Sequence, residues 1–371
     1  RAGVAPAAVE REVPGTGGRP VVDVSHSVAT AERTGPESPA PRSGSRRRGR
    51  LGDRVFRGST ALLAVGLIAL LGLLLYVLGS DGREALGRYG LSFIIGRDWN
   101  PVQGREEFGA LPFIFGTMVT SAISIVLAVP VAVGLAVLLN ESSTGWLRAP
   151  LATFVDLLAA IPSVVYGLWA LFVLKPVFDH HLEPFLQSTI GKVPVVGRLF
   201  SGNPNGGDLL TAGVILAIMI LPIVTAVSRE VIAVVPREIR EGAKALGATR
   251  YETIRMAVLP YARSGIVGAS VLGLGRALGE TIAVAMVIGG GRHIGLSLFG
   301  QASTIPSVIA SEFREATSDI HRSALMALAL ILVTIAFLMA VMSRLLVRRT
   351  EKILSGGDTE LASEQPSLGS A

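Results

Sequence analysis

Six apolar segments limit this chain to a helical membrane fold. They cover residues 60–79, 114–139, 149–174, 209–235, 262–290 and 323–347. An α-helix needs about 20 apolar residues to cross the hydrocarbon core of a bilayer, and each segment reaches that length. Half of the chain is hydrophobic and 17% is charged, a balance typical of membrane proteins and not of soluble enzymes. We therefore predict an all-α membrane protein with six transmembrane helices.

The basic residues predict the orientation of these helices. Arginine and lysine cluster in residues 46–57, 140–148, 229–263 and 344–352, whereas the other connections are mixed in charge. Because basic loops stay in the cytoplasm, we expect both termini there, with the chain in a bacterial inner (plasma) membrane. The net charge of +6 then comes from the basic residues that orient the helices in the membrane, and it does not indicate nucleic-acid binding. The run Arg46, Arg47, Arg48 and Arg50 fits this orientation signal or contact with anionic membrane lipid.

The chain divides into four predicted regions. Residues 1–55 are rich in glycine, proline, serine and arginine, and we expect a disordered cytoplasmic extension because they cannot bury a core. The first transmembrane helix and a long outer loop follow in 56–112, five more helices form a core in 113–347, and 348–371 is a cytoplasmic tail. Residues 1–10 lack the apolar centre of a signal peptide. The chain holds no cysteine, which excludes disulfides and thiol chemistry.

Prolines interrupt three consecutive apolar segments. Pro130, Pro162 and Pro222 each remove a backbone hydrogen bond and bend the helix that holds them. One such bend commonly serves packing alone. Three in consecutive helices favour a bundle whose interior moves or lines a cavity.

Arg276 and Glu280 lie deep in the segment 262–290, four residues apart, so on one helix they would share a face and pair. Ionisable groups at membrane depth are costly and commonly mark a substrate path, here an anion path with the arginine as its fixed charge. The alternative is a self-neutralising pair that only joins two helices. Gly275 and Gly279 have the small-xxx-small spacing that lets another helix approach closely.

A stripe of hydroxyl side chains follows one face of the second segment. Its members are Thr117, Thr120, Ser121 and Ser124. Such a stripe lines a wet translocation path or hydrogen-bonds to a neighbouring helix, and both interpretations stay open. Asp156, in the third segment, is predicted to be structural or interfacial.

No residue pattern in the sequence predicts catalysis or metal binding. Asp179, His180, His181 and Glu183 are close together, but the histidines lack the i, i+4 spacing of a helical metal pair, so a solvated loop is the better interpretation. The nucleotide-binding sequence G-x-x-x-x-G-K-[ST] does not occur, since the Gly-Lys pair at 191–192 is followed by valine. We therefore predict that the chain binds no cofactor or metal and is not an enzyme.

A charged, amphipathic stretch, residues 241–263, separates the fourth and fifth segments on the predicted cytoplasmic side. Residues 241–246 are predicted to form a short helix that Gly247 ends in the left-handed conformation. A second helix is predicted to start near Thr249 and to stop before Pro260. The result is a helical elbow suited to a groove on a partner protein. An amphipathic helix lying on lipid is the alternative.

This elbow resembles the cytoplasmic coupling loop of ABC importer permeases, here within residues 237–260. That loop has a Glu-Ala-Ala start, a glycine six residues after the glutamate and a Leu-Pro about a dozen residues later. The matching residues are Glu241, Ala243, Gly247, Leu259 and Pro260. Gly242 replaces the usual second-position alanine and Ala257 a common isoleucine, while the spacing is kept.

Further stretches resemble permeases of the phosphate-specific ABC importers, in particular their C-subunit branch. They are residues 96–123, 275–290 and 305–313. The resemblance implies a type I ABC importer permease fold. It also implies as partners a homologous second permease, an ATPase dimer that uses the ATP, and an extracytoplasmic phosphate-binding protein. In that family, charged residues in the stretch matching Arg276 and Glu280 are tied to transport.

Other functions stay open at this point. The coupling loop does not separate phosphate from another oxyanion such as sulfate or molybdate. An ATP-independent transporter or channel would be expected to have inverted internal repeats, and none is evident in the sequence. A membrane scaffold would use the charged pair for structure alone.

Overall fold

The computed structural model describes residues 46–141, 145–194 and 196–363. By their contacts, residues 1–64 and 65–371 form two units, and the described part of the first unit is the beginning of the first helix. The predicted extension of residues 1–55 lies outside the described residues as far as position 45, and from Arg46 onward it is helical instead. The last helix likewise continues to Ser363, through most of the predicted tail.

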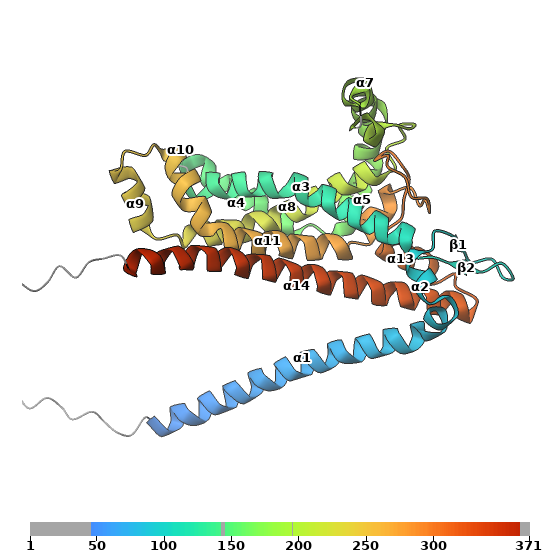
Figure 1. Cartoon of the computed structure of the whole chain (residues 1–371), viewed down its shortest axis with the longest axis horizontal. Coiled ribbons are helices and arrows are strands. Elements are labelled where there is room, and N and C mark those ends of the chain that lie inside the picture. The colour runs from blue at the N-terminus through green and yellow to red at the C-terminus, as the bar shows by residue number, and fades with distance from the viewer. Residues whose placement is uncertain (1–45, 142–144, 195, 364–371) are drawn as a thin grey trace, which may run out of the picture. The chain divides into compact units, whose positions relative to one another are not determined.

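The described chain is almost entirely helical, which confirms the predicted fold class (Figure 1). In chain order its helices are α1 (Arg46–Tyr89), α2 (Leu91–Ile95), α3 (Leu111–Glu141), α4 (Gly145–Ala160), α5 (Ser163–Trp169), α6 (Lys175–Val177), α7 (Glu183–Thr189), α8 (Leu209–Ala233), α9 (Arg237–Ala245), α10 (Arg250–Thr253), α11 (Leu259–Gly279), α12 (Ile282–Val287), α13 (Ile305–Glu312) and α14 (Asp319–Ser363). The strands β1 (Trp99–Asn100) and β2 (Glu107–Phe108) form a small antiparallel hairpin.

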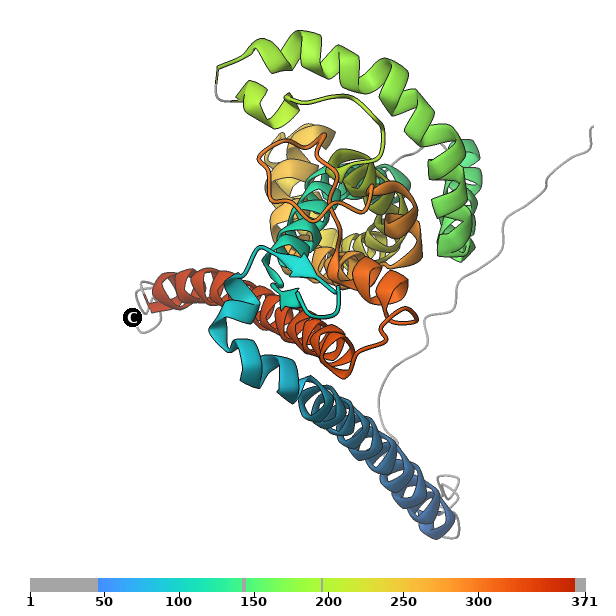
Figure 2. The ribbon, with the colours of Figure 1, turned by 90° about the vertical axis from the view of Figure 1, so that its right-hand side faces the viewer.

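Wider and tighter helical turns connect several of these helices. The π-helical turns are Ala170–Leu174, Phe178–Leu182 and Ile254–Val258, and the 3₁₀ turns are Ile190–Lys192 and Val196–Phe200. The first two π turns join α5, α6 and α7 into one curved stretch, residues 163–192, which we call the arm (Figure 2). The third joins α10 to α11, so that 250–279 is a single helix.

Among the described residues, five helices are long and apolar enough to cross a membrane. They are Arg54–Tyr89, Leu111–Glu141, Leu209–Ala233, Arg250–Gly279 and Asp319–Leu345. The predicted number of six is reached when α4 and the arm are taken as one crossing, although the two are bent by 97°. The bend lies at Pro162, whose extended backbone precedes α5. Pro130 and Pro222 lie inside α3 and α8 without ending them.

Helix α8 is the centre of the bundle. In the most apolar stretch of α8, 67% of the residues are buried. The corresponding share is 28% for α3 and 22% for the helix 250–279. The apolar side chains that remain exposed on the other helices suit surfaces that face lipid or partner helices. Helices α3 and α8 approach each other at Gly213, where an added β-carbon would lie 2.5 Å from Cγ2 of Ile123.

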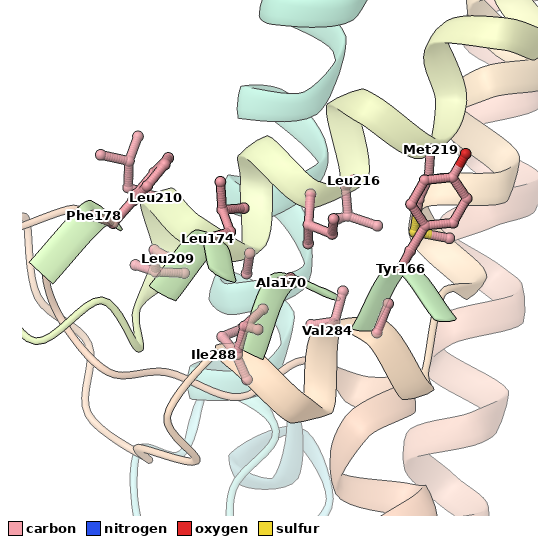
Figure 3. Packing of buried hydrophobic residues seen from close by; sticks show 14 of the residues in the cluster. Tyr166, Ala170, Leu174, Phe178, Leu209, Leu210, Leu216, Met219, Val284 and Ile288 are labelled. Carbon is pink, nitrogen blue, oxygen red and sulfur yellow. The ribbon is translucent and has the colours of Figure 1, made fainter. Parts of the chain in front are cut away.

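The arm packs against the first half of α8. Figure 3 shows Leu174 and Phe178 of the arm beside Leu209 and Leu210 of α8. Farther along, Tyr166 lies near Met219, and the Tyr166 hydroxyl donates to the carbonyl of Leu158 at 2.8 Å, across the bend at Pro162. Side chains of α12 complete this cluster. The arm is thereby held to the centre of the bundle by apolar contacts along its length.

A second apolar cluster lies around the hairpin, at the end of the bundle opposite α9 and α10 (Figure 1). Trp99 packs edge-on against Phe108 and Phe113, with ring centroids 4.8 and 5.0 Å apart. α13 and the first turns of α14 close the cluster from the other side. Three distant parts of the chain are therefore tied together at this end.

We predict that Gly213→Ala lowers the stability of the protein, because the new methyl group overlaps the β-carbon region of Ile123 and overpacking costs about 1–3 kcal/mol. The matched control is Gly134→Ala, where an added β-carbon meets nothing within 4 Å and alanine favours the helix. Thermal unfolding of the purified protein, followed by tryptophan fluorescence, measures both. Equal melting temperatures for the two variants would contradict the close α3–α8 contact.

Candidate functional site

The elbow between α8 and α11 has the geometry that the sequence predicts at its glycine. α9 ends at Ala245, and Gly247 has a φ of 86°, in the region that favours glycine. The N–H of Gly247 donates to the carbonyl of Lys244, and the N–H of Ala248 donates to the carbonyl of Ala243. These two bonds form a Schellman motif, which satisfies the last carbonyls of the helix. The left-handed turn at Gly247 is thus confirmed.

The second half of the elbow begins with a strong cap. The Thr249 hydroxyl accepts from the N–H of Glu252, and the Glu252 carboxylate accepts from the N–H of Thr249, which is a capping box. The prediction that this helix stops before Pro260 is wrong. The helix continues to Gly279, and the π turn Ile254–Val258 directly precedes the proline. The N–H of Leu259 bonds to the carbonyl of Ile254, so the wider turn accommodates the residue that cannot donate.

Arg240 fixes the elbow to two long helices. Its side chain lies 3.0 Å from Oε1 of Glu141, the last residue of α3. It also donates to the carbonyls of Val235 at 2.6 Å and Ile232 at 2.9 Å, at the end of α8. Sequence reasoning missed this contact, because the pair is 99 positions apart and neither residue belongs to a motif.

The outward surface of the elbow is apolar at several positions. The exposed side chains are Val234 at 78%, Leu246 at 91%, Tyr251 at 67% and Met256 at 73%. Of the predicted coupling residues, Glu241 and Pro260 are exposed while Ala243 and Leu259 are partly buried. A cavity of about 360 Å³ lies between the elbow and the end of α3, lined by Glu141, Arg240, Lys244, Arg250, Thr253 and Ile254. Bulky apolar groups on a charged, rigid elbow are suited to a groove on another protein.

The predicted pairing of Arg276 with Glu280 is wrong. α11 ends at Gly279, and Glu280 has an extended backbone with a ψ of 127°, so the two residues do not share a helix face. Among the described residues, the ion pairs within 4.0 Å do not include one between Arg276 and Glu280. Glu280 instead turns toward the N–H of Ala283 at the start of α12, at 3.5 Å. Arg276 is exposed.

Gly275 and Gly279 form an open face on α11 beside Arg276. Both glycines are exposed, and a β-carbon added at either would meet nothing within 4 Å in the described part of the chain. No helix of this chain's described residues therefore uses their small size. The predicted close packing of another helix against these glycines is therefore not made within the described residues.

The hydroxyl stripe of α3 is buried in this structure. Thr117, Thr120, Ser121 and Ser124 are each at most 1% exposed, so they do not line an open path here. Thr117 accepts from the N–H of Ile305 at 2.9 Å, at the start of α13. Thr120 and Ser124 donate to carbonyls of their own helix. Of the two interpretations, the bond to a neighbouring helix is the one that the structure shows for Thr117.

The segment around His180 and His181 is helical and not a loop. Both histidines are exposed, but Glu183 is fully buried, which corrects the expectation of a solvated segment. Within the described residues, no group of three metal-binding side chains comes together.

Asp156, predicted to be structural or interfacial, is exposed and lies 4.0 Å from Arg229 of α8.

A polar network that the sequence did not predict holds the hairpin end. Glu312 accepts from the indole N–H of Trp99 at 2.8 Å and from Arg292 at 2.8 Å, and its other contact is His321 Nε2 at 3.0 Å. Arg292 also donates to the carbonyl of Trp99. The four residues lie on separate elements between 99 and 321, so only the fold brings them together. The buried carboxylate of Glu312 is fully engaged by this network.

Comparison with known sequences identifies the family. A family model described as "Binding-protein-dependent transport system inner membrane component" matches residues 128–352. A Pasteurella multocida (strain Pm70) protein named "Phosphate transport system permease protein PstC" is 45% identical over 81% of this chain and 93% of its own length. The Haemophilus influenzae (strain Rd) protein of the same name is 41% identical over 81% of this chain and 94% of its own length. The chain belongs to this permease family.

As a member of the permease family, the chain is an inner-membrane component of a binding-protein-dependent transport system. It is a multi-pass transport subunit and not an enzyme.

Among solved structures, the chain is similar to one described as a bacterial ABC transporter involved in the import of the acidic polysaccharide alginate. The TM-score is 0.49 at 19% identity, over 81% of this chain and 99% of that chain. The family assignment rests on the sequence matches alone.

Replacing the glycine of the elbow should loosen it. Gly247→Ala places a side chain in a left-handed conformation, which costs about 1–2 kcal/mol, whereas Gly242→Ala lies inside α9 with nothing within 4 Å. We expect trypsin to cleave the purified permease several-fold faster at Lys244 or Arg250 in Gly247→Ala than in the wild type. Gly242→Ala should be cleaved no faster than the wild type. Equal cleavage of all three proteins would show that the elbow does not depend on this turn.

Proposed function

We propose that this chain is the permease subunit of an ATP-driven importer and forms part of the membrane passage for inorganic phosphate. The observation that carries the proposal is 45% identity over 93% of a relative named as a phosphate transport system permease. Relatives from Xylella fastidiosa and Mesorhizobium japonicum with the same name are 45% and 44% identical. A phosphate ion cannot cross about 30 Å of hydrocarbon unaided, so the passage must be a wet route that opens to one side at a time.

The proposed partners follow from the surfaces that the chain leaves uncovered. The elbow, with Leu246 and Tyr251 exposed, is the docking element for an ATPase dimer, which uses the ATP. The open glycine face of α11 receives a homologous second permease, since small residues let two membrane helices come close. A phosphate-binding protein delivers the ion at the hairpin end. We propose that the elbow and both termini lie in the cytoplasm, as the clusters of basic residues predict.

In the proposed mechanism, closure of the ATPase dimer moves the elbow, and Arg240 transmits the movement. Its bonds to Glu141 and to the carbonyls of Ile232 and Val235 connect α9 with the ends of α3 and α8 at once. These are the two most closely packed helices of the bundle, so they move together. The passage then changes from one side to the other as a shift between two states of the bundle.

Arg276 and Glu280 are proposed as groups of the phosphate path. Arg276 lies on the same open face as Gly275 and Gly279, so in the assembled importer it is placed between the two permeases. Because Glu280 turns to α12 and does not pair with it, the guanidinium keeps its positive charge available to an anion. The hydroxyls of Thr117, Thr120, Ser121 and Ser124 join this path only in a state of the bundle that uncovers them.

We predict ATP-dependent uptake of labelled phosphate into vesicles that hold the chain with its ATPase, second permease and binding protein. Excess sulfate and molybdate should leave uptake unchanged. Replacing ATP by a non-hydrolysable analogue should abolish it, and uptake that persists would indicate a channel or secondary transporter. Competition by sulfate or molybdate with equal potency would indicate a permease for another oxyanion.

We predict that Arg276→Ala reduces phosphate uptake at least tenfold while the complex stays assembled, because the path loses its fixed positive charge. The matched control is Arg344→Ala, which removes an exposed arginine near the end of the span Asp319–Leu345 of α14 and should leave uptake at the wild-type level. Copurification with the ATPase reports assembly of both variants. Wild-type uptake by an assembled Arg276→Ala complex would remove this residue from the path.

A further inference from the structure

Two carboxyl groups from different elements meet in the interior where the arm reaches α8. Glu183 is the first residue of α7, and Asp208 directly precedes α8. Both residues are 0% exposed, and the Glu183 carboxylate accepts from the backbone N–H groups three and two residues before Asp208, so the two carboxyl groups are neighbours. Burying one carboxylate is costly, and burying two in contact is costlier still because like charges repel.

Each carboxyl has one oxygen that accepts from the backbone. Oε2 of Glu183 accepts from the N–H groups of Asn205 at 2.9 Å and Gly206 at 3.3 Å. Oδ1 of Asp208 accepts from the N–H of Thr211 at 2.8 Å, as the N-cap of α8. These bonds fix both side chains in place, and they tie the arm to the loop that enters α8.

The other oxygen of each carboxyl has no partner. Oε1 of Glu183 and Oδ2 of Asp208 are both buried and accept no hydrogen bond from the described residues. Buried polar atoms are rarely left without a partner. One proton between the two carboxyl groups would satisfy both atoms at once and would leave one negative charge instead of two.

The surrounding charges do not neutralise the pair. The charged and titratable groups on the elements that pack here are Lys175 of α6, Asp179, His180 and His181 of the arm, and Arg292 and His293 after α12. Within the described residues none of them forms an ion pair with Glu183 or Asp208. Arg292 is bound to Glu312, and Asp179 is near His180. The negative charge of Glu183 raises the pKa of Asp208.

We infer that Glu183 and Asp208 form a proton-binding site that clasps the arm to the N-terminus of α8. With the proton bound, the two carboxyl groups share a hydrogen bond and the arm is held. When the proton leaves, two negative charges face each other in a buried site without a counter-charge, and the arm separates from α8. The proton then acts as a ligand that sets how firmly the arm is closed on the bundle.

The pH at which this happens follows from the environment of Asp208. Burial raises the pKa of Asp208 from 3.8 to about 7, the bond from Thr211 opposes this shift, and the negative charge of Glu183 adds to it. A raised carboxyl pKa stabilises the folded state most in acid. The stabilisation is complete below about pH 4, declines as the pH rises, and is lost above a pH of about 7.

Infrared spectroscopy of the purified full chain tests the site directly. We expect the carbonyl band of a protonated carboxylic acid at pH 6 that disappears by pH 8, with a midpoint of about 7. The band should be absent from the double variant Glu183→Gln, Asp208→Asn, whose amide oxygens still accept from the backbone N–H groups and keep the N-cap. Glu183→Gln alone should move the midpoint to lower pH, because the like charge is gone.

Asp179→Asn is the matched control, since it removes a partly exposed carboxylate from the same arm and should leave the titration unchanged. The proposal is overturned if the wild type and the double variant have the same carboxyl bands between pH 6 and pH 8. It is also overturned if Glu183→Gln titrates with the wild-type midpoint. Neither result depends on phosphate transport, so failure here would leave the proposed function untouched.

The clasp itself is measured by the distance between the arm and α3. The chain has no cysteine, so spin labels at Phe185→Cys on α7 and Ala122→Cys on α3, both exposed, are specific for these sites in the purified chain. We expect a longer and broader distance distribution at pH 8 than at pH 6. The double variant should keep the pH 6 distribution at both values. A wild-type distribution that does not change with pH would refute the clasp.

Discussion

The close packing of α8 against α3 is the contact on which the rest of the structure depends. Gly213 brings the two backbones together against Ile123, and α8 then presents its remaining faces to α11, α12, α4 and the arm. Within a bilayer the gain from burying apolar surface is small, because lipid is as apolar as a side chain. Close van der Waals contact and buried hydrogen bonds therefore decide which helices stay together. The hydroxyl of Thr117, which accepts from Ile305, is one such bond.

Each end of this central pair carries a polar contact that joins it to a peripheral element. At one end Arg240 binds the last residue of α3 and two carbonyls at and just beyond the end of α8, which fixes the elbow. At the other end Asp208 caps α8 and meets Glu183 of the arm. The two peripheral elements therefore contact α8 at its opposite ends.

The sequence predicted what is local and missed what depends on distant contacts. The apolar segments and the turn at Gly247 follow from length and from backbone preferences that need no partner. The Arg276–Glu280 pair failed because the helix ends at Gly279, and α11 holds five glycines, so a glycine there does not single out the end. Glu183 was assigned to solvent because its neighbours in sequence are polar, whereas the fold places it against Asp208. Arg240 was overlooked because its partner Glu141 lies on another helix.

The π turn Ile254–Val258 has a consequence for how the elbow faces its surroundings. A π turn holds one residue more than an α turn, and one residue of an α-helix corresponds to a rotation of about 100°. The extra residue therefore sets the angular position of Tyr251 and α10 relative to every side chain of α11. Deleting a single residue there would leave both helices intact and aim the elbow in a different direction. The rotation of one end of this continuous helix relative to the other is therefore set by the π turn that precedes Pro260.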